Sequence, residues 1–567
     1  MVVLCIFLVF LLSPVSVTAQ VNQQNIVSTD SPLYEYIEAV YIAEGFAPPS
    51  ESRPWTQEEF RRYIRNIRPH ISSDSSHALV ETLESELATN SLFQFSDDDN
   101  SHVVSWFRFN TEAEAAIEGF WHENLHNSEN YTQGTYDWIH GYEERKELIN
   151  LPLELWVGPI LYMHSSLTLR EEYNTISLTQ SQASQLPEAA AEVEQNNWNL
   201  PNIALPKLDL YFPFRAFLSL GGPHWNVSFG RDRLDWGNGN TGNLVLSDYS
   251  HWFDFGRLRL YWPFFSFDTV YGVMDHWLGD GTNIEYKAYL GRRLEFTLFD
   301  RLLFSITESM AFGNQEPLLF RDLNPLMIFH NWSDPDRCNS SIAIDLSVTP
   351  IRFIEVYAQA VMDEFMTSYE SDRDGGGGPG VFGVLGGLEF YYPIGAGYLR
   401  SYFEGAYTDP WLYNRRATPL FTNVRRYWSF VTNSFEYVVK PLGYEYSPDT
   451  ILLEGHVSYT RPAMYSFAFA AASLWKGEQV LESEYTPSTD ISTPSGNVEH
   501  SLIFHLSAEA SINTITGLLL HTDIPLLNHI SIGSNIYYRL RTNLHHIPDA
   551  ASADLETSFY IQRAVNN

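Results

Sequence analysis

Short stretches in which apolar and polar residues alternate recur from about residue 103 to the end of this 567-residue chain. In Ile354–Ala360, apolar residues occupy every second position, and Glu355 and Gln359 stand between them. Phe107–Ala115 and Ile342–Val348 repeat the pattern. Because successive side chains of a strand point to opposite faces, each stretch predicts a strand with one apolar and one polar face.

A chain with many such strands is typical of an outer-membrane β-barrel, which meets lipid on its outer face and a wet lumen on its inner face. Residues 100–567, at about 25 residues per strand with its loop, predict about 18 strands. We therefore expect an all-β transmembrane fold, an antiparallel barrel over residues 100–567. The clearest strand candidates are Leu208–Phe212, Leu258–Trp262, Leu294–Leu298, Leu302–Glu308, Leu399–Tyr407, Leu452–Tyr459, Ile503–Ile512, Ile530–Leu540 and Thr557–Gln562.

The first 19 residues have the features of a cleavable export signal. Val2–Leu12 is apolar, and the small residues Val17 and Ala19 predict cleavage after Ala19. The apolar stretch is shorter than the roughly 20 residues that a spanning helix needs. We expect residues 1–19 to be a signal peptide and the mature protein to lie in the bacterial outer membrane.

Residues 20–95 have a helical rather than a strand-like pattern. Apolar residues from Leu33 to Tyr41 recur at helical spacing, and Gly45 follows as a stop signal. Thr56 and Glu59 fit a capping box at the start of a second helix. A third helix is predicted from about residue 75 to 87. We expect a small N-terminal helical bundle that packs against the periplasmic end of the barrel.

Composition narrows the possible partners. The formal net charge of −35 argues against nucleic acid and anionic membrane surfaces, which both require a basic footprint. The aromatic fraction of 15% fits the aromatic girdles of a membrane barrel. It also fits a soluble carbohydrate-binding β-protein. After removal of the signal peptide, Cys338 is the one remaining cysteine, so the mature chain forms no internal disulfide.

Two arginines are the first candidates for a ligand site. Arg231 and Arg233 share a face if their strand continues through both, and the planar fork of arginine fits the anionic groups of a sugar. The alternative is a ladder of salt bridges in the lumen with Asp232, Asp235 or other carboxylates.

Further weak candidates for glycan binding are Trp236, Asn238, Arg425 and Arg426. Trp236 and Asn238 lie beside the glycines of a tight turn, where an indole could stack on a sugar ring. For most tryptophans of a barrel, the interface girdle is the stronger explanation. Arg425 and Arg426 could equally belong to a solvated loop. No motif indicates catalysis, a metal site or a cofactor, because acidic pairs are expected by chance in so acidic a chain.

Several segments together resemble the capsule assembly Wzi family of outer-membrane proteins. They are the helical opening with Arg53–Thr56, the segments Phe229–Gly237 and Gly242–Ser247, and the stretch from Arg293–Phe296 through Ser305–Glu308 to Leu323–Leu326. The resemblance implies an 18-stranded barrel with a small periplasmic helical bundle. It also implies a non-enzymatic, lectin-like role in attaching or organising surface polysaccharide. The strongly negative charge of this chain would repel an acidic capsule unless basic residues are gathered locally.

The sequence therefore predicts an outer-membrane barrel, not an enzyme, that binds surface or capsular polysaccharide in capsule assembly or anchoring. Its expected partners are that polysaccharide and outer-membrane lipid, and we expect a monomer. The main alternative is a porin-like channel for small, preferentially cationic solutes. A soluble secreted protein that binds or cleaves glycans is the third possibility.

Overall fold

The fold is taken from a computed structural model of the whole chain. The structure describes residues 22–87, 93–95, 107–111, 113–127, 146–169, 198–199, 207–209, 213–250, 252–277, 284–313, 324, 338–363, 381–414, 421–429, 434–481, 483, 492–520 and 530–563. The predicted signal peptide lies outside these residues.

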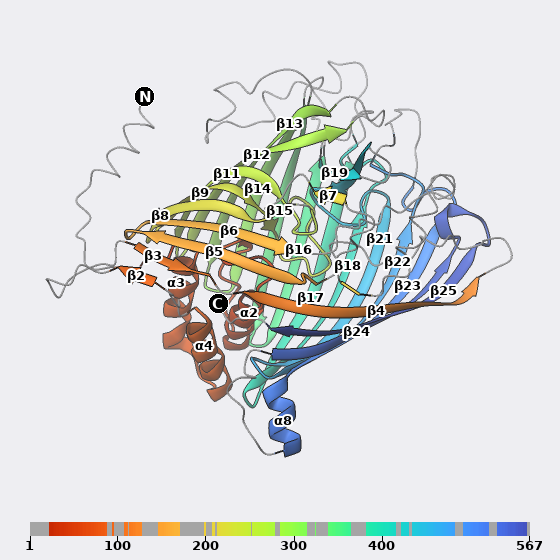
Figure 1. The fold of residues 1–567 in the computed structure, drawn as a ribbon. Coiled ribbons are helices and arrows are strands. Elements are labelled where there is room, and N and C mark those ends of the chain that lie inside the picture. Colours follow the sequence, from red (N-terminus) through yellow and green to blue (C-terminus); the bar gives the residue numbers. More distant parts are fainter. Residues whose placement is uncertain are drawn as a thin grey trace.

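A closed antiparallel barrel dominates the molecule (Figure 1). Among the described residues, 18 strands form the ring, and β25 pairs with β4 to close it. In ring order the strands are β4 (Glu114–Asn127), β5 (Ile149–Val157), β6 (Leu161–Leu169), β8 (Ala216–Gly222), β9 (Trp225–Asp232), β11 (Phe253–Trp262), β12 (Phe265–Trp277), β13 (Ile284–Leu298), β14 (Leu302–Phe312), β15 (Cys338–Ile351), β16 (Ile354–Asp363), β17 (Val381–Ile394), β18 (Gly397–Thr408), β21 (Thr450–Arg461), β22 (Tyr465–Lys476), β23 (Glu499–Ser511), β24 (Ile530–Thr542) and β25 (Ala551–Arg563).

Smaller elements extend or fill the ring. β3 (Phe107–Asn110) pairs with β5 beside the start of β4, and β2 (Phe93–Phe95) pairs with β3. A two-stranded sheet joins β1 (Ser52–Arg53) to β10 (Asp235–Trp236), and a three-stranded sheet joins β7 (Lys207–Asp209), β19 (Thr422–Ser429) and β20 (Ser434–Pro441). The helices are α2 (Leu33–Glu44), α3 (Gln57–Ile67), α4 (Asp74–Glu86) and α8 (Ile512–Leu520), with the 3-10 turns η1 (Arg68–His70) and η5 (Leu544–His546).

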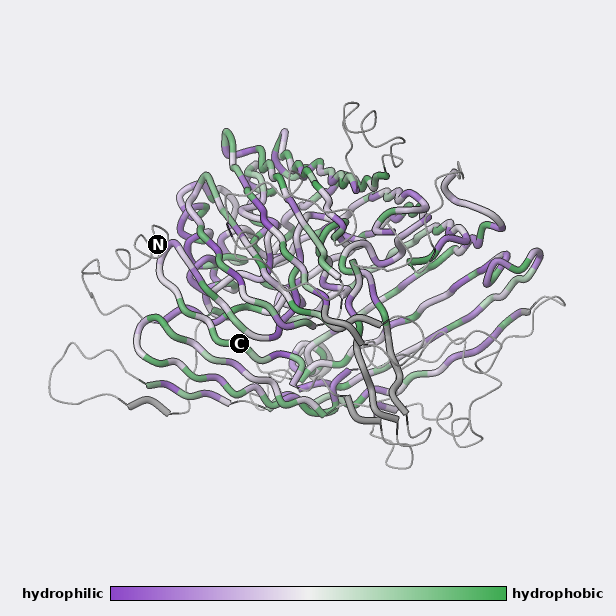
Figure 2. Tube along the Cα trace, turned by 90° about the horizontal axis from the view of Figure 1, so that it is seen from above, coloured by the Kyte–Doolittle hydropathy of each residue, from purple (hydrophilic) through white to green (hydrophobic). Residues whose placement is uncertain are grey.

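The alternating pattern produces the two faces that the sequence predicts. Along β16, exposed and buried residues alternate from Val356 to Asp363, and the exposed ones are mostly apolar. Figure 2 shows hydrophilic and hydrophobic positions alternating along strands of the barrel. The outward-facing residues include Ile117, Phe229, Ile344, Phe403, Phe467 and Phe559. The predicted antiparallel barrel with an apolar outer face is confirmed.

The three N-terminal helices begin and end close to the predicted residues. Gly45 ends α2 with a left-handed φ of 86°, and its N–H donates to the Ile42 carbonyl. Thr56 and Glu59 form the predicted capping box at the start of α3. α2, α3 and α4 lie together at one end of the barrel (Figure 1). None of the helices that the structure describes is long and apolar enough to span a membrane.

Tight turns mark the barrel end at which these helices lie. Turns of two or three residues join seven pairs of strands there, at 158–160, 223–224, 263–264, 299–301, 352–353, 395–396 and 462–464. The connection from β23 to β24 at the same end is longer and begins with α8. The helical unit touches this rim directly, because the Ala47 N–H donates to the Asp300 carbonyl and the Phe353 N–H donates to the Ile42 carbonyl. Connections at the opposite end have six residues or more, as at 278–283.

Two sequence-based strand assignments need correction. The stretch Leu208–Phe212 was expected in the barrel, but the described strand there is β7, which pairs with β19 outside the ring. Phe107–Ala115 does not form one strand: β3 ends at Asn110, and β4 begins at Glu114. The alternating pattern alone does not show where a strand ends, because the end depends on how far the neighbouring strand pairs with it.

Much of the lumen is filled by two segments that fold into it. We call residues 22–56 and the β9–β11 connection, residues 233–252, the lumen insert. Within it, Trp236, Leu244 and Leu246 are fully buried. They pack in a hydrophobic core with inward-facing residues of β12–β17, such as Val270, Tyr357 and Leu385. We call the wall from β11 to β18 the filled half.

Buried ion pairs fasten the lumen insert to the filled half. The Arg293 guanidinium, on β13, donates to Asp345 at 2.6 Å and to Glu295 at 2.9 Å on the wall, and to Glu51 of the insert at 3.3 Å. All four side chains are buried, with at most 3% of any of them exposed. Two further contacts join the same wall to the insert: Arg257 donates to the Pro54 carbonyl, and Arg400 donates to Glu35.

The wall from β21 to β25, which we call the open half, has a different burial pattern. On β22 no residue of either face is buried, whereas on β16 every second residue is. The inward face of β22 carries the small residues Ala468, Ala470 and Ala472. Its neighbours present stacked polar rings, such as His505 and Tyr537 with centroids 4.0 Å apart. The lumen beside this wall is therefore accessible to water.

Candidate glycan-binding cavity

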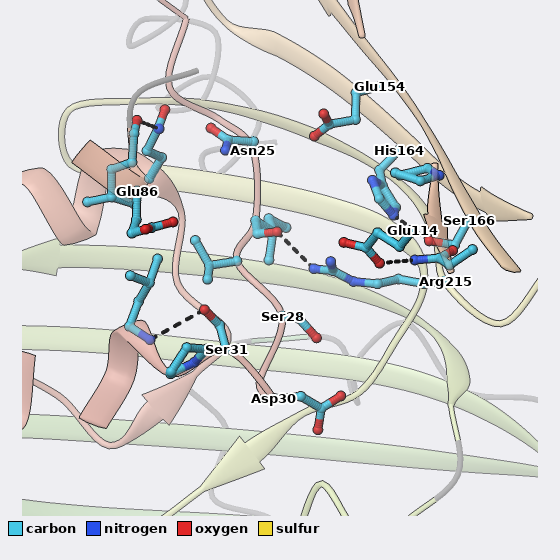
Figure 3. A pocket seen from close by; sticks show the side chains of 18 of the residues that line it. Asn25, Ser28, Asp30, Ser31, Glu86, Glu114, Glu154, His164, Ser166 and Arg215 are labelled. Atoms are coloured by element: carbon cyan, nitrogen blue, oxygen red, sulfur yellow. Dashed lines mark hydrogen bonds between the residues drawn. The ribbon is translucent and has the colours of Figure 1, made fainter. Parts of the chain in front are cut away.

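A cavity of about 710 Å³ lies in the lumen between the N-terminal segment and the strands β4–β6. This volume falls within the range of roughly 300–1,000 Å³ found for small-molecule sites. Figure 3 shows its two sides. The wall of the barrel contributes Glu114, Glu154, His164, Ser166 and Arg215, and the N-terminal unit contributes Asn25, Ser28, Asp30, Ser31 and Glu86.

Strand alternation aims the polar residues of β5 and β6 into the cavity. A hydrogen-bonded chain runs along this wall: the Tyr162 hydroxyl donates to Glu154 at 2.7 Å and lies 3.2 Å from His164 Nδ1. His164 Nε2 lies 3.0 Å from the Ser166 hydroxyl. Asn110 also donates to Glu154, at 2.9 Å. These contacts hold the side chains in fixed positions, as a preorganised binding surface requires.

Carboxylates dominate the charge of the cavity. Among the described residues that line it are five acidic side chains, Asp30, Glu86, Glu114, Glu147 and Glu154, and one arginine, Arg215. Arg215 already donates to Asp232 at 3.1 Å and to the Ile26 carbonyl at 2.8 Å. Burial raises the pKa of the Glu86 carboxyl above its usual range.

Three polar atoms of the lining have no hydrogen-bond partner among the described residues. Asn25 Oδ1, Asn150 Oδ1 and Thr168 Oγ1 are buried and have no hydrogen-bond partner within the part of the chain that the structure describes. A buried polar atom without a partner is costly, and all three can accept a hydrogen bond. A bound molecule with several donors would satisfy them.

Arg231 and Arg233 do not act together. Arg231 lies on the outer face of β9 and pairs with Asp254 of β11, with Nη2 2.6 Å from Oδ2. β9 ends at Asp232, so Arg233 leaves the strand. Its guanidinium stacks on Trp252, 3.7 Å from the ring centroid, and lies 3.4 Å from Asp30. Trp252 and Asp30 both line the cavity, so Arg233 stands directly behind its wall.

The other predicted glycan-binding residues lie away from the cavity. Trp236 is fully buried in the core of the lumen insert, with no exposed surface for a sugar. Asn238 is half-exposed and donates to the Leu346 carbonyl at 3.5 Å. Arg425 and Arg426 lie on β19, and their side chains lie outside the described residues.

The cavity residues were not singled out in the sequence. His164, Ser166 and Thr168 alternate with the apolar Met163 and Leu167, which marks them as lumen-facing. That signal does not separate a cavity residue from any other residue of the inner face. The separation depends on where residues 22–33 dock, and those residues carry no periodic pattern that would reveal their docking site.

No protein-family profile and no curated protein matches this sequence. Among solved structures, the chain is similar to Wzi, an outer-membrane, carbohydrate-binding β-barrel involved in group 1 capsule assembly in Escherichia coli. The match has a TM-score of 0.56 at 13% identity and covers 95% of this chain and 99% of Wzi. OccK10 of Pseudomonas aeruginosa matches with a TM-score of 0.37 at 8% identity, covering 80% of this chain and 99% of its own. OccAB1 of Acinetobacter baumannii matches with a TM-score of 0.36 at 9% identity, covering 80% of this chain and 96% of its own. The predicted resemblance is therefore confirmed at the level of the fold: this chain is an 18-stranded outer-membrane barrel with the fold of Wzi.

Proposed function

We propose that this protein binds a surface polysaccharide at the outer membrane and acts, without catalysis, in the assembly or anchoring of a capsule-like layer. The observation that carries the proposal is the cavity of about 710 Å³, lined with hydrogen-bonding side chains, in a barrel with this fold. Such a lining suits sugar hydroxyls, which both donate and accept hydrogen bonds. That Wzi is a carbohydrate-binding barrel supports the proposal.

The orientation that we propose places the helical unit in the periplasm. Bacterial outer-membrane barrels have short periplasmic turns and longer extracellular loops, and α2–α4 lie at the short-turn end. β19 lies toward the opposite end, where Lys287 Nζ donates to Thr422 Oγ1 at 2.8 Å. Arg425 and Arg426 on β19 are then proposed contacts for polysaccharide outside the cell.

One observation favours the alternative of a channel for small cationic solutes. The open half is accessible to water and carries inward-facing carboxylates such as Glu454, Glu509 and Glu556. Against a wide channel stands the lumen insert, which occupies the space beside the filled half. The rival functions therefore make opposite predictions about ion flow.

The test measures planar-bilayer conductance and polysaccharide binding on the same purified protein. We expect no steady current and saturable binding of surface polysaccharide from the host. A steady cation-selective current that the polysaccharide does not change would reject the proposal and favour the channel. As a control, a variant that lacks residues 237–250 of the insert should conduct if the insert is what blocks the lumen.

A further inference from the structure

One wall of the cavity carries a serine and a histidine in hydrogen-bond contact, with the surroundings of an activated nucleophile. We propose that Ser166 and His164 hydrolyse acyl esters, such as O-acetyl groups, on a glycan that enters the cavity. This activity is additional to the proposed role in assembly or anchoring, for which binding alone suffices. It rests on the proposed function only for the glycan nature of its substrate.

The hydrogen bonds along β5 and β6 assign each proton of the pair. Glu154 accepts on both oxygens, from the Tyr162 hydroxyl at 2.7 Å and from the Asn110 side-chain amide at 2.9 Å. Because the Tyr162 proton points to Glu154, the Tyr162 oxygen accepts from His164 Nδ1, 3.2 Å away. His164 Nε2 then carries no proton and accepts from the Ser166 hydroxyl, 3.0 Å away. In this state a histidine can act as the base that deprotonates a serine.

Packing fixes the plane of the imidazole. The His164 ring stacks on Phe217 of β8, with centroids 5.3 Å apart and planes at 21°. Two positions earlier on the same face, the Tyr162 ring packs against Trp156 with centroids 5.1 Å apart. The side chains of the chain from Glu154 to Ser166 are therefore held in one arrangement, as a nucleophile and its base require.

Two donors lie beside Ser166 for the negative charge that forms on the carbonyl oxygen of the ester. Arg215 is directly across from Ser166, because the Ser166 N–H donates to the Arg215 carbonyl at 2.8 Å, and its side chain lines the cavity (Figure 3). Thr168 follows Ser166 on the same face of β6. Its hydroxyl is buried and has no hydrogen-bond partner among the described residues. A cation and a hydroxyl placed in this way stabilise an oxyanion.

The reaction consumes only the ester and water. Ser166 Oγ attacks the carbonyl carbon while His164 Nε2 takes the hydroxyl proton. The bond from that carbon to the sugar oxygen then breaks, and His164 returns the proton to the sugar oxygen. The sugar hydroxyl leaves, and the acyl group stays on Ser166. Water that His164 deprotonates attacks the acyl-serine, the carboxylic acid leaves, and the Ser166 hydroxyl is restored.

The orientation of β6 favours a glycan ester over a phospholipid ester. The apolar residues Met163, Leu167 and Leu169 point outward and are exposed on the lipid face. Ser166 points the other way, into the cavity, where Asn25 of the N-terminal segment adds a further polar side chain. A sugar with a short acyl group fits such a lining better than a long fatty-acyl chain does.

Acetate release from O-acetylated xylo-oligosaccharides tests the activity on the full chain in detergent. Ser166→Ala and His164→Gln remove the nucleophile and the base, so each should lower the rate at least about a hundredfold. Ser219→Ala is the matched control. It removes another buried serine hydroxyl, paired in register with Tyr162 but outside the cavity lining, and should leave the rate unchanged. Retained heat-modifiable mobility on gels would show that each barrel still folds.

Two further measurements separate catalysis from a structural role of the hydrogen bonds. A fluorophosphonate should label the wild type at Ser166, as mapped by mass spectrometry, and should not label His164→Gln. Tyr162 is a positioning residue, and Tyr162→Phe removes only the hydroxyl between His164 and Glu154. This change should lower kcat about tenfold and leave KM unchanged.

The outcomes separate the hydrolysis from polysaccharide binding. If the wild type releases acetate no faster than Ser166→Ala, or if the fluorophosphonate does not label Ser166, the hydrolysis is rejected, while binding of the host polysaccharide would still support the proposed function. Release of fatty acid from phosphatidylethanolamine micelles, with no release of acetate, would overturn the assignment of a glycan ester. If acetate release requires Ser166 but the host polysaccharide does not bind, the proposed function fails and the hydrolysis stands.

Discussion

The filled half and the open half of the lumen are built from the same kind of strand, but their inward-facing side chains contact different things: protein in the filled half and water in the open half. Beside the filled half, the lumen insert covers the wall, so that Arg293 and Trp236 have essentially no exposed surface. Beside the open half, β22 has no buried residue on either face. The alternating pattern of a strand therefore determines only which side chains point inward. Whether those side chains stabilise the fold or face the water of the lumen depends on the segment that docks against them.

The largest effect is expected for Arg293→Met. The change leaves Glu51, Glu295 and Asp345 buried without their cation, and breaking a buried ion pair from one side costs about 3–5 kcal/mol. With three carboxylates affected, we expect the upper end of this range in urea unfolding followed by gel mobility. Arg539→Met, the matched change in the open half, removes a half-exposed pair with Glu556 and should cost below about 1 kcal/mol. Equal losses would contradict the comparison of the halves.

Trp236→Ala should be the next most damaging change. It removes a fully buried indole from the core of the insert, which costs about 3–4 kcal/mol through lost contacts and the space left behind. Glycan affinity per folded molecule should stay unchanged in titrations. A loss of affinity at unchanged stability would instead support the prediction that Trp236 stacks on a sugar.

Thiol labelling should distinguish the two walls without changing stability. In a Cys338→Ser background, a cysteine introduced by Ala470→Cys on β22 should react readily with a charged, water-soluble maleimide. A cysteine introduced by Ala343→Cys on β15 should stay unmodified in the folded protein, because Ala343 is 1% exposed beneath the insert. Rapid labelling of both positions would show that the insert does not seal the filled half.

A change of pH should also act on the insert, through a single carboxyl group. Burial and the neighbouring Asp248 carboxylate raise the pKa of Asp235, in the insert, to about 8. The folded protein therefore keeps a proton that the unfolded chain releases above about pH 4. The free energy of unfolding should decrease as pH rises from about 4 to about 8. Asp235→Asn should flatten this dependence, as measured by unfolding midpoints across that range, and an unchanged slope would exclude Asp235 as its source.

Those elements that carry their own periodicity could be predicted from the sequence. The alternation in Ile354–Ala360 became β16, and the capping box of Thr56 and Glu59 begins α3 where expected. Both signals are local, because a strand face and a helix cap depend on residues a few positions apart.

The lumen insert and the cavity could not be predicted in this way. Gly237 suggested a tight turn beside an accessible Trp236, but the chain there pairs with β1 and enters the core. Gly237 has a φ of 137°, and Asn243 and Gln359 fill the place of a Cβ atom. Asn243 lies in another part of the insert and Gln359 lies on β16, so the sequence around Gly237 gives no sign of either contact.

The ties between the lumen insert and the wall also constrain how the protein is assembled. Glu51 and Arg293 are 242 residues apart, and Glu35 and Arg400 are 365 apart, so the N-terminal segment leaves the export machinery long before its partners. The ring closes only when β25, at the end of the chain, pairs with β4. The ion pair of Glu51 therefore cannot form before β13 is made, and that of Glu35 cannot form before β18 is made. The part of the protein made first therefore gains its buried partners only after many of the barrel strands have followed it.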